Sequence, residues 1–584
     1  MSEVARLVVE VVPDVTGIDR SFDYFVPDEM KSSIDIGSRV RVNLNGRRVG
    51  GWVISFVTRA ETNDVHESEL KPILKCSGVG PDETIVSLSR WAANRWCVGK
   101  LRPFLVTGSP HSVVSRIAPS RRTKVVASPI SPAASKLLAE GGGMLRLPPT
   151  HDQLPAVLSA AHLGPTLVVC ATVDSSRVMA ARLKRAGISV ALMPQDWSSA
   201  RGGVDVVIGA RSAAFAPCPN LSAAVVLDEH EESLQEERMP TWHAREVLAE
   251  RCRESGAALL LISASPTTVG SHSRTTLAPP PERERAGWPS VEVIDRSAEP
   301  VWNRSLVSAG LIEVLRDPGL RVVCISNTKG LARLLGCRSC GVLVRCEVCS
   351  STLVELEDAR LECPVCHLTR PPVCAVCSST AISRLRPGVT RLREELEKAA
   401  NRPVAKIESG DIVVDEASHD IFIGTSATLH QIHRADVVVF LDFDRELLAP
   451  RFQAHEQAMA LLVRASRLVG PRSRKGRILI QTSFPDHDVV RAAVEGNPGI
   501  LTDAETERRR TLGLPPFSAL AVVEGDGVDR CVESLVGVEG LVISRHRGRA
   551  LIRAVDHRRL SNAWMSVPAP IRSLVRIEVD PLSM

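Results

Sequence analysis

Eight cysteines stand close together in the second half of the chain, arranged as four Cys-x-x-Cys pairs. Each pair can supply two thiolates to one tetrahedral metal ion, with metal–sulfur distances of about 2.3 Å. Eight thiolates make two closed four-sulfur sites, which are structural because no coordination position stays open for water or substrate. Iron–sulfur clusters and redox thiols are the alternatives. Spacing alone leaves three ways of combining the pairs. The cysteines are Cys337, Cys340, Cys346, Cys349, Cys363, Cys366, Cys374 and Cys377.

The composition is that of an ordinary globular protein. The 584 residues allow about three to five domains, and 44% hydrophobic with 24% charged residues exclude disorder for most of the length. A net charge of +5 permits nucleic-acid binding without requiring it. Charged residues near the start and the lack of a long apolar run predict neither a leader peptide nor a membrane span, and therefore a cytoplasmic protein. In that compartment clustered cysteines are read as metal ligands before disulfides.

The strands and helices expected from the sequence are grouped in several segments of the chain. Residues 7–12, 39–44 and 49–57 read as strands, and residues 83–96 have helical spacing of apolar residues. Residues 107–150 are rich in Ser, Pro, Gly and Arg, which predicts a linker or a small domain.

Beyond residue 150, buried strands and helices alternate, which is the rhythm of a parallel α/β sheet. The first block has strands at 166–170, 204–209, 223–227 and 257–263, with helices at 175–186 and 244–255. The second has strands at 321–326, 421–424, 437–442 and 477–482 and a helix at 455–468, and the cysteine cluster interrupts it. Residues 491–584 look like a separate α+β tail.

Motifs spread over nearly the whole chain resemble those of the PriA family of primosomal replication-restart helicases. The cysteine cluster, inserted in the second α/β block, resembles that family's zinc domain. The other matching segments are residues 21–27, 37–42, 209–217, 228–231, 242–245, 263–267, 386–390, 478–482 and 512–517.

The resemblance implies a multidomain α/β fold. We expect a β-rich 3′-end DNA-binding domain at 1–106 and a degenerate winged-helix-like segment or linker at 107–147. Two RecA-like parallel α/β lobes follow at 148–295 and 296–490, the second carrying a zinc-binding insert at 337–377. An α+β domain for DNA or partner binding is expected at 491–584. In the family the outer cysteine pairs share one zinc ion and the inner pairs share the other.

The resemblance also implies a site for the 3′ end of a nascent DNA strand, formed by Phe22, Asp23, Tyr24 and Gly37. An aromatic ring can stack on a terminal base, and a carboxylate can accept a hydrogen bond from a free 3′-hydroxyl. The alternative is that Phe22 and Tyr24 are core residues on one face of a strand.

The phosphate-binding part of a helicase is missing from this sequence. A P-loop reads Gly-x-x-x-x-Gly-Lys-[Ser/Thr], whereas the only Gly-Lys pair here is Gly99-Lys100, far from the first α/β strand. Residues 147–153 stand where the loop belongs, and two prolines remove amide donors from it. Asp228, Glu229 and Arg467 are remnants of the catalytic set, with Arg464 nearby. We therefore expect two zinc ions, but these residues do not support binding of ATP and Mg²⁺.

These observations predict a PriA-like replication-restart protein without a working motor. It would bind stalled forks, D-loops and single-stranded DNA, and hold the arrested 3′ end. It would promote primosome assembly and loading of the replicative helicase DnaB, with primosome proteins and single-stranded DNA-binding protein as partners, in the nucleoid. The enzymatic alternative is a residual ATP-dependent 3′-to-5′ helicase with an atypical phosphate site. The third possibility is a non-functional relic or a purely zinc-dependent interaction scaffold, which would show no preference for forks carrying a 3′-hydroxyl over forks carrying a 3′-phosphate.

Overall fold

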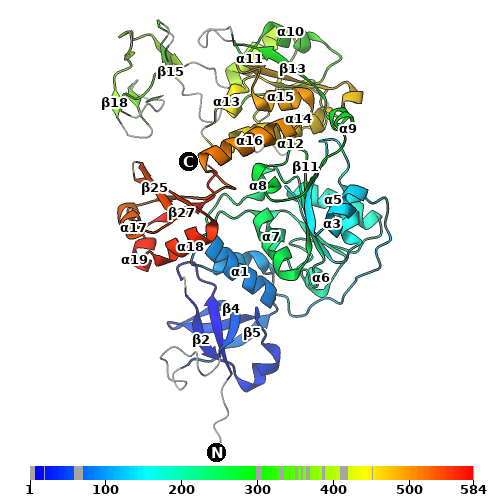
Figure 1. The fold of residues 1–584 in the computed structure, drawn as a ribbon, viewed down its shortest axis with the longest axis vertical. Coiled ribbons are helices and arrows are strands. Elements are labelled where there is room, and N and C mark those ends of the chain that lie inside the picture. Colours follow the sequence, from blue (N-terminus) through cyan, green and yellow to red (C-terminus); the bar gives the residue numbers. More distant parts are fainter. Residues whose placement is uncertain are drawn as a thin grey trace, which may run out of the picture.

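The structure is a computed structural model of residues 1–584, and its elements form five parts (Figure 1). It describes residues 7–582 except 19, 58–69, 298–304, 328–334, 338, 341, 343, 349–352, 357–359, 364–367, 385–388, 408–417, 450 and 547. An N-terminal module lies at the lower end of Figure 1, two α/β lobes lie above it, and a small cysteine module and a C-terminal module lie beside the lobes. No helix among the described residues is long and apolar enough to cross a membrane.

The N-terminal module is an antiparallel sheet with strand order β2–β1–β4–β3–β5, followed by two helices. Alternate valines of β1 and β3 fill its interior, as the β-rich sequence pattern predicts. The Asp82 carboxylate accepts a hydrogen bond from the Ile85 amide and so caps α1. The elements are β1 (Val8–Pro13), β2 (Phe22–Phe25), β3 (Arg39–Leu44), β4 (Arg47–Val57), β5 (Lys75–Gly78), α1 (Glu83–Arg95) and α2 (Arg102–Gly108).

The first lobe is a parallel sheet of order β12–β6–β11–β10–β7–β9–β8. Successive residues of β7 point into cores on opposite faces, Leu167 and Val169 into one and Val168 into the other, which is why its strands read as continuous apolar runs. The elements are α3 (Pro132–Ala139), β6 (Gly142–Arg146), α4 (Leu154–Ala161), β7 (Thr166–Val169), α5 (Val173–Arg185), β8 (Val190–Leu192), α6 (Trp197–Gly202), β9 (Val206–Gly209), β10 (Ala223–Leu227), α7 (Ala244–Ser255), β11 (Ala258–Ser263), α8 (Thr268–Ser271), β12 (Thr276–Leu277) and α9 (Pro281–Ala286).

The first sheet begins earlier in the chain than residue 148. Strand β6 pairs with β11, and both β6 and α3, which packs on it, lie within the segment 107–147. The rest of that segment, residues 109–131, is fully described and contains no helix or multi-residue strand, so the winged-helix form is absent from it.

The second lobe is also a parallel sheet, of order β13–β23–β22–β14–β21–β20. Its first strand lies before residue 296. Both RecA-like parallel lobes expected from the alternating pattern are confirmed. The elements are β13 (Ser290–Asp295), α10 (Ala309–Arg316), β14 (Val322–Ile325), α11 (Val389–Ala400), β20 (Ala405–Ile407), β21 (Ile421–Gly424), α12 (Thr428–Gln431), β22 (Val437–Phe440), α13 (Asp444–Leu447), α14 (Ala454–Val469), β23 (Arg477–Thr482) and α15 (Asp488–Glu495).

The cysteine module is inserted between β14 and α11, and contains only short strands. These are β15 (Leu335–Cys337), β16 (Val354–Glu355), β17 (Leu361–Glu362), β18 (Thr369–Arg370) and β19 (Ile382–Arg384). The C-terminal module is an antiparallel sheet of order β25–β26–β24–β27 with helices, which confirms the α+β tail. Its elements are α16 (Gly499–Leu512), β24 (Ala519–Glu524), α17 (Val528–Leu535), β25 (Leu541–His546), β26 (Arg549–Ala554), α18 (His557–Ser566), α19 (Ala569–Arg572) and β27 (Arg576–Val579).

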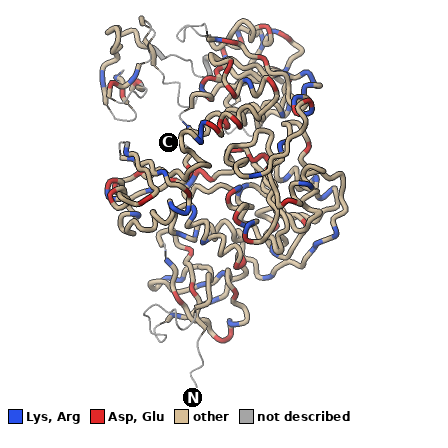
Figure 2. Tube along the Cα trace, in the orientation of Figure 1, with Lys and Arg blue, Asp and Glu red and all other residues tan. Residues whose placement is uncertain are grey.

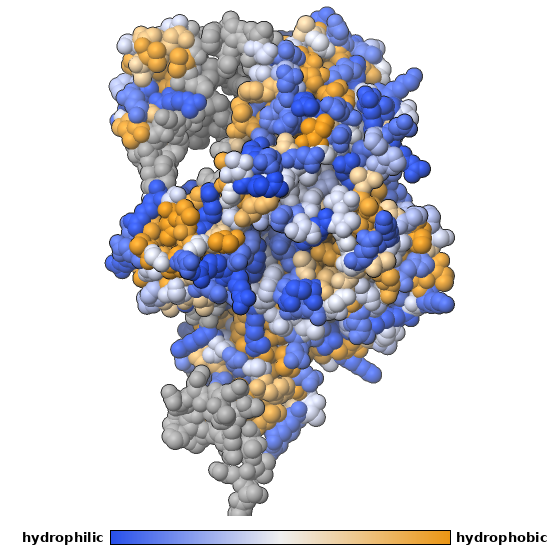
Figure 3. Space-filling view, in the orientation of Figure 1, coloured by the Kyte–Doolittle hydropathy of each residue, from blue (hydrophilic) through white to orange (hydrophobic). Residues whose placement is uncertain are grey.

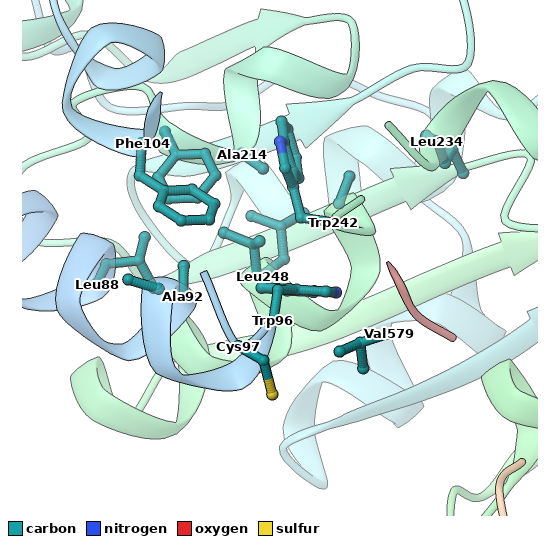
Figure 4. Close-up of a cluster of buried hydrophobic side chains, with 14 of the residues drawn as sticks. Leu88, Ala92, Trp96, Cys97, Phe104, Ala214, Leu234, Trp242, Leu248 and Val579 are labelled. Carbon is teal, nitrogen blue, oxygen red and sulfur yellow. The ribbon is translucent and has the colours of Figure 1, made fainter. Parts of the chain in front are cut away.

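One hydrophobic core joins three of the five parts. Trp96 and Phe104 from the N-terminal helices pack with Trp242 of the first lobe and Val579 of the C-terminal sheet in a single buried cluster (Figure 4). The Phe104 and Phe215 rings are 5.6 Å apart, and Phe215 meets Trp242 edge-on at 5.1 Å. The core therefore fixes how the N-terminal and C-terminal modules sit on the first lobe.

Candidate functional sites: a cysteine cluster, a filled cleft and an N-terminal sheet

Four cysteines of the inserted module form one cluster. The sulfur atoms of Cys337, Cys340, Cys374 and Cys377 all lie within 4.8 Å of one another, with 3.5 Å between Cys337 and Cys377 and 3.6 Å between Cys340 and Cys374. A tetrahedral ion with bonds of about 2.3 Å requires sulfur separations of roughly 3.8 Å. The cluster therefore fits a metal ion held by the outer two pairs, the combination that the resemblance implies.

Backbone amides favour the thiolate at two of the four clustered cysteines, whereas the pKa values of Cys340 and Cys377 are raised beside the neighbouring sulfurs. Hydrogen bonds from the Cys340 and Ser339 amides lower the pKa of Cys337 to about 6, and amides of Cys377 and Val376 lower the pKa of Cys374. These turns direct amide dipoles at the sulfurs before any ion arrives, and a thiolate is the form that binds metal.

Of the inner pairs, Cys346 and Cys363 lie in one small buried cluster of the same module, whereas Cys349 and Cys366 lie outside the described residues. Of the seven cysteines outside the four Cys-x-x-Cys pairs, Cys76 is half-buried. The other six are buried: Cys97, Cys170, Cys218, Cys252, Cys324 and Cys531.

Asp228 directly follows β10, at the contact between the two lobes. The Arg467 guanidinium, from α14 of the second lobe, donates to both of its carboxylate oxygens, one bond being 2.9 Å. Gln153 donates to the same carboxylate at 2.7 Å. Burial raises the pKa of Asp228, but the Arg467 charge and these hydrogen bonds outweigh it and hold the pKa at about 2. The carboxylate is thus occupied by the protein's own donors.

The loop before α4 stands where the resemblance places a phosphate-binding loop, and its polar groups bond within the chain itself. Pro148 and Pro149 carry no amide hydrogen, and the His151 amide donates to the Pro148 carbonyl at 3.0 Å. The Asp152 carboxylate accepts from the Leu154 amide at 2.9 Å, at the start of α4. A carboxylate therefore stands at the helix end that binds phosphate in a P-loop, and these residues do not fit a bound nucleotide.

The carboxylates of Glu229 and Glu231 are also paired with arginines of the chain. Glu229 is buried and pairs with Arg245, and it also accepts from the Thr267 amide at 3.2 Å. Glu231 accepts two hydrogen bonds, of 2.9 and 3.0 Å, from Nε of Arg464. Of the remnant residues that the sequence indicates, Asp228 and Arg467 meet directly, while Glu229 faces Arg245 instead.

In the N-terminal module, the predicted 3′-end residues lie on both faces of β2. Tyr24 belongs to the core of the sheet with 4% of its surface exposed, and its hydroxyl donates to the Asn43 carbonyl at 3.1 Å. Phe22 is half-buried beside that core, with the Arg20 guanidinium 4.9 Å from its ring centre. Tyr24 therefore occupies the core position that we weighed as the alternative to base stacking.

Asp23 lies directly opposite Glu10 in the β1–β2 pair. Burial, together with the charge of Glu10, raises the pKa of Asp23. A half-buried carboxyl of this kind can accept or share a hydrogen bond with a hydroxyl group.

The backbone requires a glycine at position 37. Its φ is +89°, and a Cβ at this position would lie 1.5 Å from the Pro81 carbonyl oxygen. Any side chain there would separate the turn before β3 from the segment that leads into α1.

Sequence reasoning missed the roles of two residues at the contact between the lobes. Gln153 donates to Asp228, and the Asp152 carboxylate accepts from the Leu154 amide. The only available signal was an Asp two residues before the apolar helix at Leu154.

Comparisons with known proteins agree with this arrangement. A family model described as the PriA 3′ DNA-binding domain matches residues 10–101, which is the N-terminal module with α1. The replication restart protein PriA of Bacillus subtilis is 29% identical over 367 residues, covering 58% of this chain and 45% of that protein. The PriA protein of Thermotoga maritima is 28% identical over 349 residues, covering 56% of this chain and 47% of that protein.

The aligned part of this chain thus spans about half the length of these two relatives. A probable replication restart protein PriA of Mycobacterium tuberculosis aligns more extensively. It is 26% identical over 581 residues, which is 88% of this chain and 85% of that protein.

Proposed function

Because the chain belongs to the PriA family of replication restart proteins, we propose that it recognises stalled forks and D-loops by holding the arrested nascent 3′ end. The match of residues 10–101 to the family's 3′ DNA-binding domain carries this proposal. Asp23 would accept the free 3′-hydroxyl, a donor that an internal phosphodiester lacks. Phe22, which keeps part of its ring exposed, is the aromatic that can contact the terminal base.

The same proposal assigns no helicase activity to the chain. Phosphoryl transfer depends on a phosphate cradle, its lysine, a metal ion and arginine fingers, and one such arginine contributes about 10³–10⁵ in rate. Here the Asp152 carboxylate lies where phosphates are held, and Arg467 is paired with Asp228. Both contacts favour a protein that binds DNA without a nucleotide cycle.

The remaining role is that of a platform. The cysteine module, ordered by two zinc ions, would present a rigid surface to primosome proteins. With single-stranded DNA-binding protein, the assembly would then lead to loading of the helicase DnaB, in the nucleoid of the cytoplasm. Binding of zinc to thiolates contributes on the order of 10–16 kcal/mol, which is enough to order a module with so small a core.

Fork binding and ATP hydrolysis measured on one preparation test the proposal. We expect forks with a 3′-hydroxyl end to bind equally well with and without an ATP analogue, and no fork-stimulated hydrolysis. Hydrolysis that a fork stimulates and that Asp228→Ala abolishes would reject the absence of a motor. Equal affinity for forks that end in 3′-hydroxyl and 3′-phosphate would reject the 3′-end role.

A further inference from the structure

Residues 109–131, which we call the strap, connect α2 of the N-terminal module to α3 of the first lobe. The strap starts beside the N-terminal sheet, where Val114 forms a bridge with Val79. It then crosses the first lobe in an extended form at the lower right of Figure 1.

Hydrogen bonds hold the strap on the first lobe at successive positions. The Ala118 amide donates to the Ser198 hydroxyl at 3.0 Å, and the Arg121 amide donates to the Gly203 carbonyl at 2.9 Å. Thr123 donates twice to the buried Asp205 carboxylate, each time at 2.8 Å. A segment without regular structure is therefore held in one conformation by the lobe beneath it.

The strap lies within a part of the sequence that has cations and no acids. From Thr84 to Ala139 the chain contains no Asp or Glu, whereas 67 acids are present in the 584 residues. The same stretch contains Arg90, Arg95, Lys100, Arg102, Arg116, Arg121, Arg122, Lys124 and Lys136. Arg95 pairs with Asp580 and Arg102 pairs with Asp14, so the helical cations are partly neutralised.

The strap cations Arg116, Arg121 and Lys124 are exposed. None of the three forms an ion pair with a carboxylate in the part of the chain that the structure describes. Arg122, in contrast, turns inward and donates to the Pro219 carbonyl. Blue segments mark Lys and Arg along this edge of the molecule in Figure 2. The strap thus presents an uncompensated row of positive charge, fixed in place by its backbone.

We propose that the strap binds the phosphate backbone of the DNA duplex behind the 3′ end that the N-terminal module holds. This inference rests on the proposed function, because it places a second DNA contact beside the first. An extended chain reaches at most about 28 Å from residue 116 to residue 124. That length corresponds to roughly eight base pairs of B-DNA.

The chemistry of the strap favours a duplex over a single strand or a protein. Single-strand grooves combine cations with aromatic rings on which bases stack, and residues 109–131 contain no Phe, Trp or Tyr. Arginine and lysine without aromatic neighbours contact phosphates and carry no sequence information. A replication fork can stall at any DNA sequence. A surface that contacts only phosphates can bind the duplex whatever that sequence is.

The test compares two triple variants with equal loss of charge. The strap variant is Arg116→Ala, Arg121→Ala and Lys124→Ala. The control variant is Arg177→Ala, Lys184→Ala and Arg185→Ala, three exposed cations on α5 of the same lobe. The affinity of each protein is measured against salt concentration, on a fork with about 20 base pairs behind the 3′ end and on the single strand alone.

Each lost phosphate contact lowers the slope of log K against log salt by about one. We expect the strap variant to lose about 2–3 from the slope on the fork, to bind the single strand as the wild type does, and to keep the preference for a 3′-hydroxyl. The control variant should keep the wild-type slope. A strap variant with the wild-type slope on the fork, or with an equal loss on the single strand, would overturn the proposal. A wild type without a 3′-hydroxyl preference would instead reject the 3′-end role, while the slope would still report on the strap.

Discussion

Arg467 of the second lobe binds both carboxylate oxygens of Asp228 in the first lobe. One turn earlier on the same helix, Arg464 binds Glu231 of the first lobe. At the start of that helix, Glu456 accepts from the Thr268 amide at 2.7 Å. Helix α14 is therefore bound to the first lobe along its length.

Removing Arg467 is expected to destabilise the protein. Arg467→Ala leaves the Asp228 carboxylate, which is 13% exposed, without its main partner. Loss of one member of a well-buried pair costs about 3–5 kcal/mol, and since the Arg467 side chain is 32% exposed we expect about 2 kcal/mol. Urea unfolding measures the change. Arg477→Ala, which breaks an exposed pair with Glu292, should cost less than about 1 kcal/mol, and equal losses in the two variants would contradict the assignment.

Acid should weaken the same contact. Although burial opposes ionisation, Arg467 and Gln153 hold the pKa of Asp228 at about 2, whereas an unfolded Asp titrates near about 3.9. A carboxyl with a lowered pKa stabilises the fold above about pH 4, and this contribution is lost as pH falls through about 2. Urea unfolding between these pH values should show wild type losing about 2 kcal/mol more than Asp228→Asn. Parallel pH profiles would contradict this prediction.

Metal analysis tests the cysteine module. We expect about two zinc ions per chain in the wild type, because four Cys-x-x-Cys pairs supply ligands for two four-sulfur sites. Cys374→Ser should lose one of them, since Cys374 lies in the cluster with Cys337, Cys340 and Cys377. Cys324→Ala, which changes a buried cysteine of β14, is the matched control and should keep both. Equal zinc content in the two variants would reject the cluster as a metal site.

Two substitutions on β2 separate binding from folding. Asp23→Ala should remove the preference for a 3′-hydroxyl over a 3′-phosphate while leaving the melting temperature nearly unchanged, because the side chain is half-buried at the surface of the sheet. Tyr24→Phe should keep the preference and lose about 1 kcal/mol, which is the value of its hydrogen bond to Asn43. A Tyr24→Phe protein without the preference would place the tyrosine hydroxyl in the DNA site.

The sequence predicts the strands of the sheets better than it predicts the contacts between the two lobes. Strand β10 is a continuous apolar run because both of its faces are buried, and both β10 and β23 have the bounds expected from the pattern. The four clustered cysteines are equally visible, since thiolate ligands require fixed spacing.

The contacts between the two lobes could not be predicted from the amino-acid sequence. Arg467 and Asp228 are 239 residues apart, and nothing in local sequence says that an arginine pairs with a carboxylate so distant. The ion pair forms only when the two lobes pack against each other. The position of β6 in the first sheet could not be predicted for the same reason. The strand lies at residues 142–146 and pairs with β11, which is more than a hundred residues later in the chain.

The buried aromatic cluster that joins Trp96, Trp242 and Val579 has a consequence for shortened forms of the protein. A chain truncated before β24 would expose the side of α1 and the first lobe that the C-terminal sheet covers. Such a truncation would leave a large apolar surface in water, which favours aggregation. Deleting the C-terminal module is therefore expected to destabilise the rest of the protein. A defect of such a variant would not identify a function of that module alone.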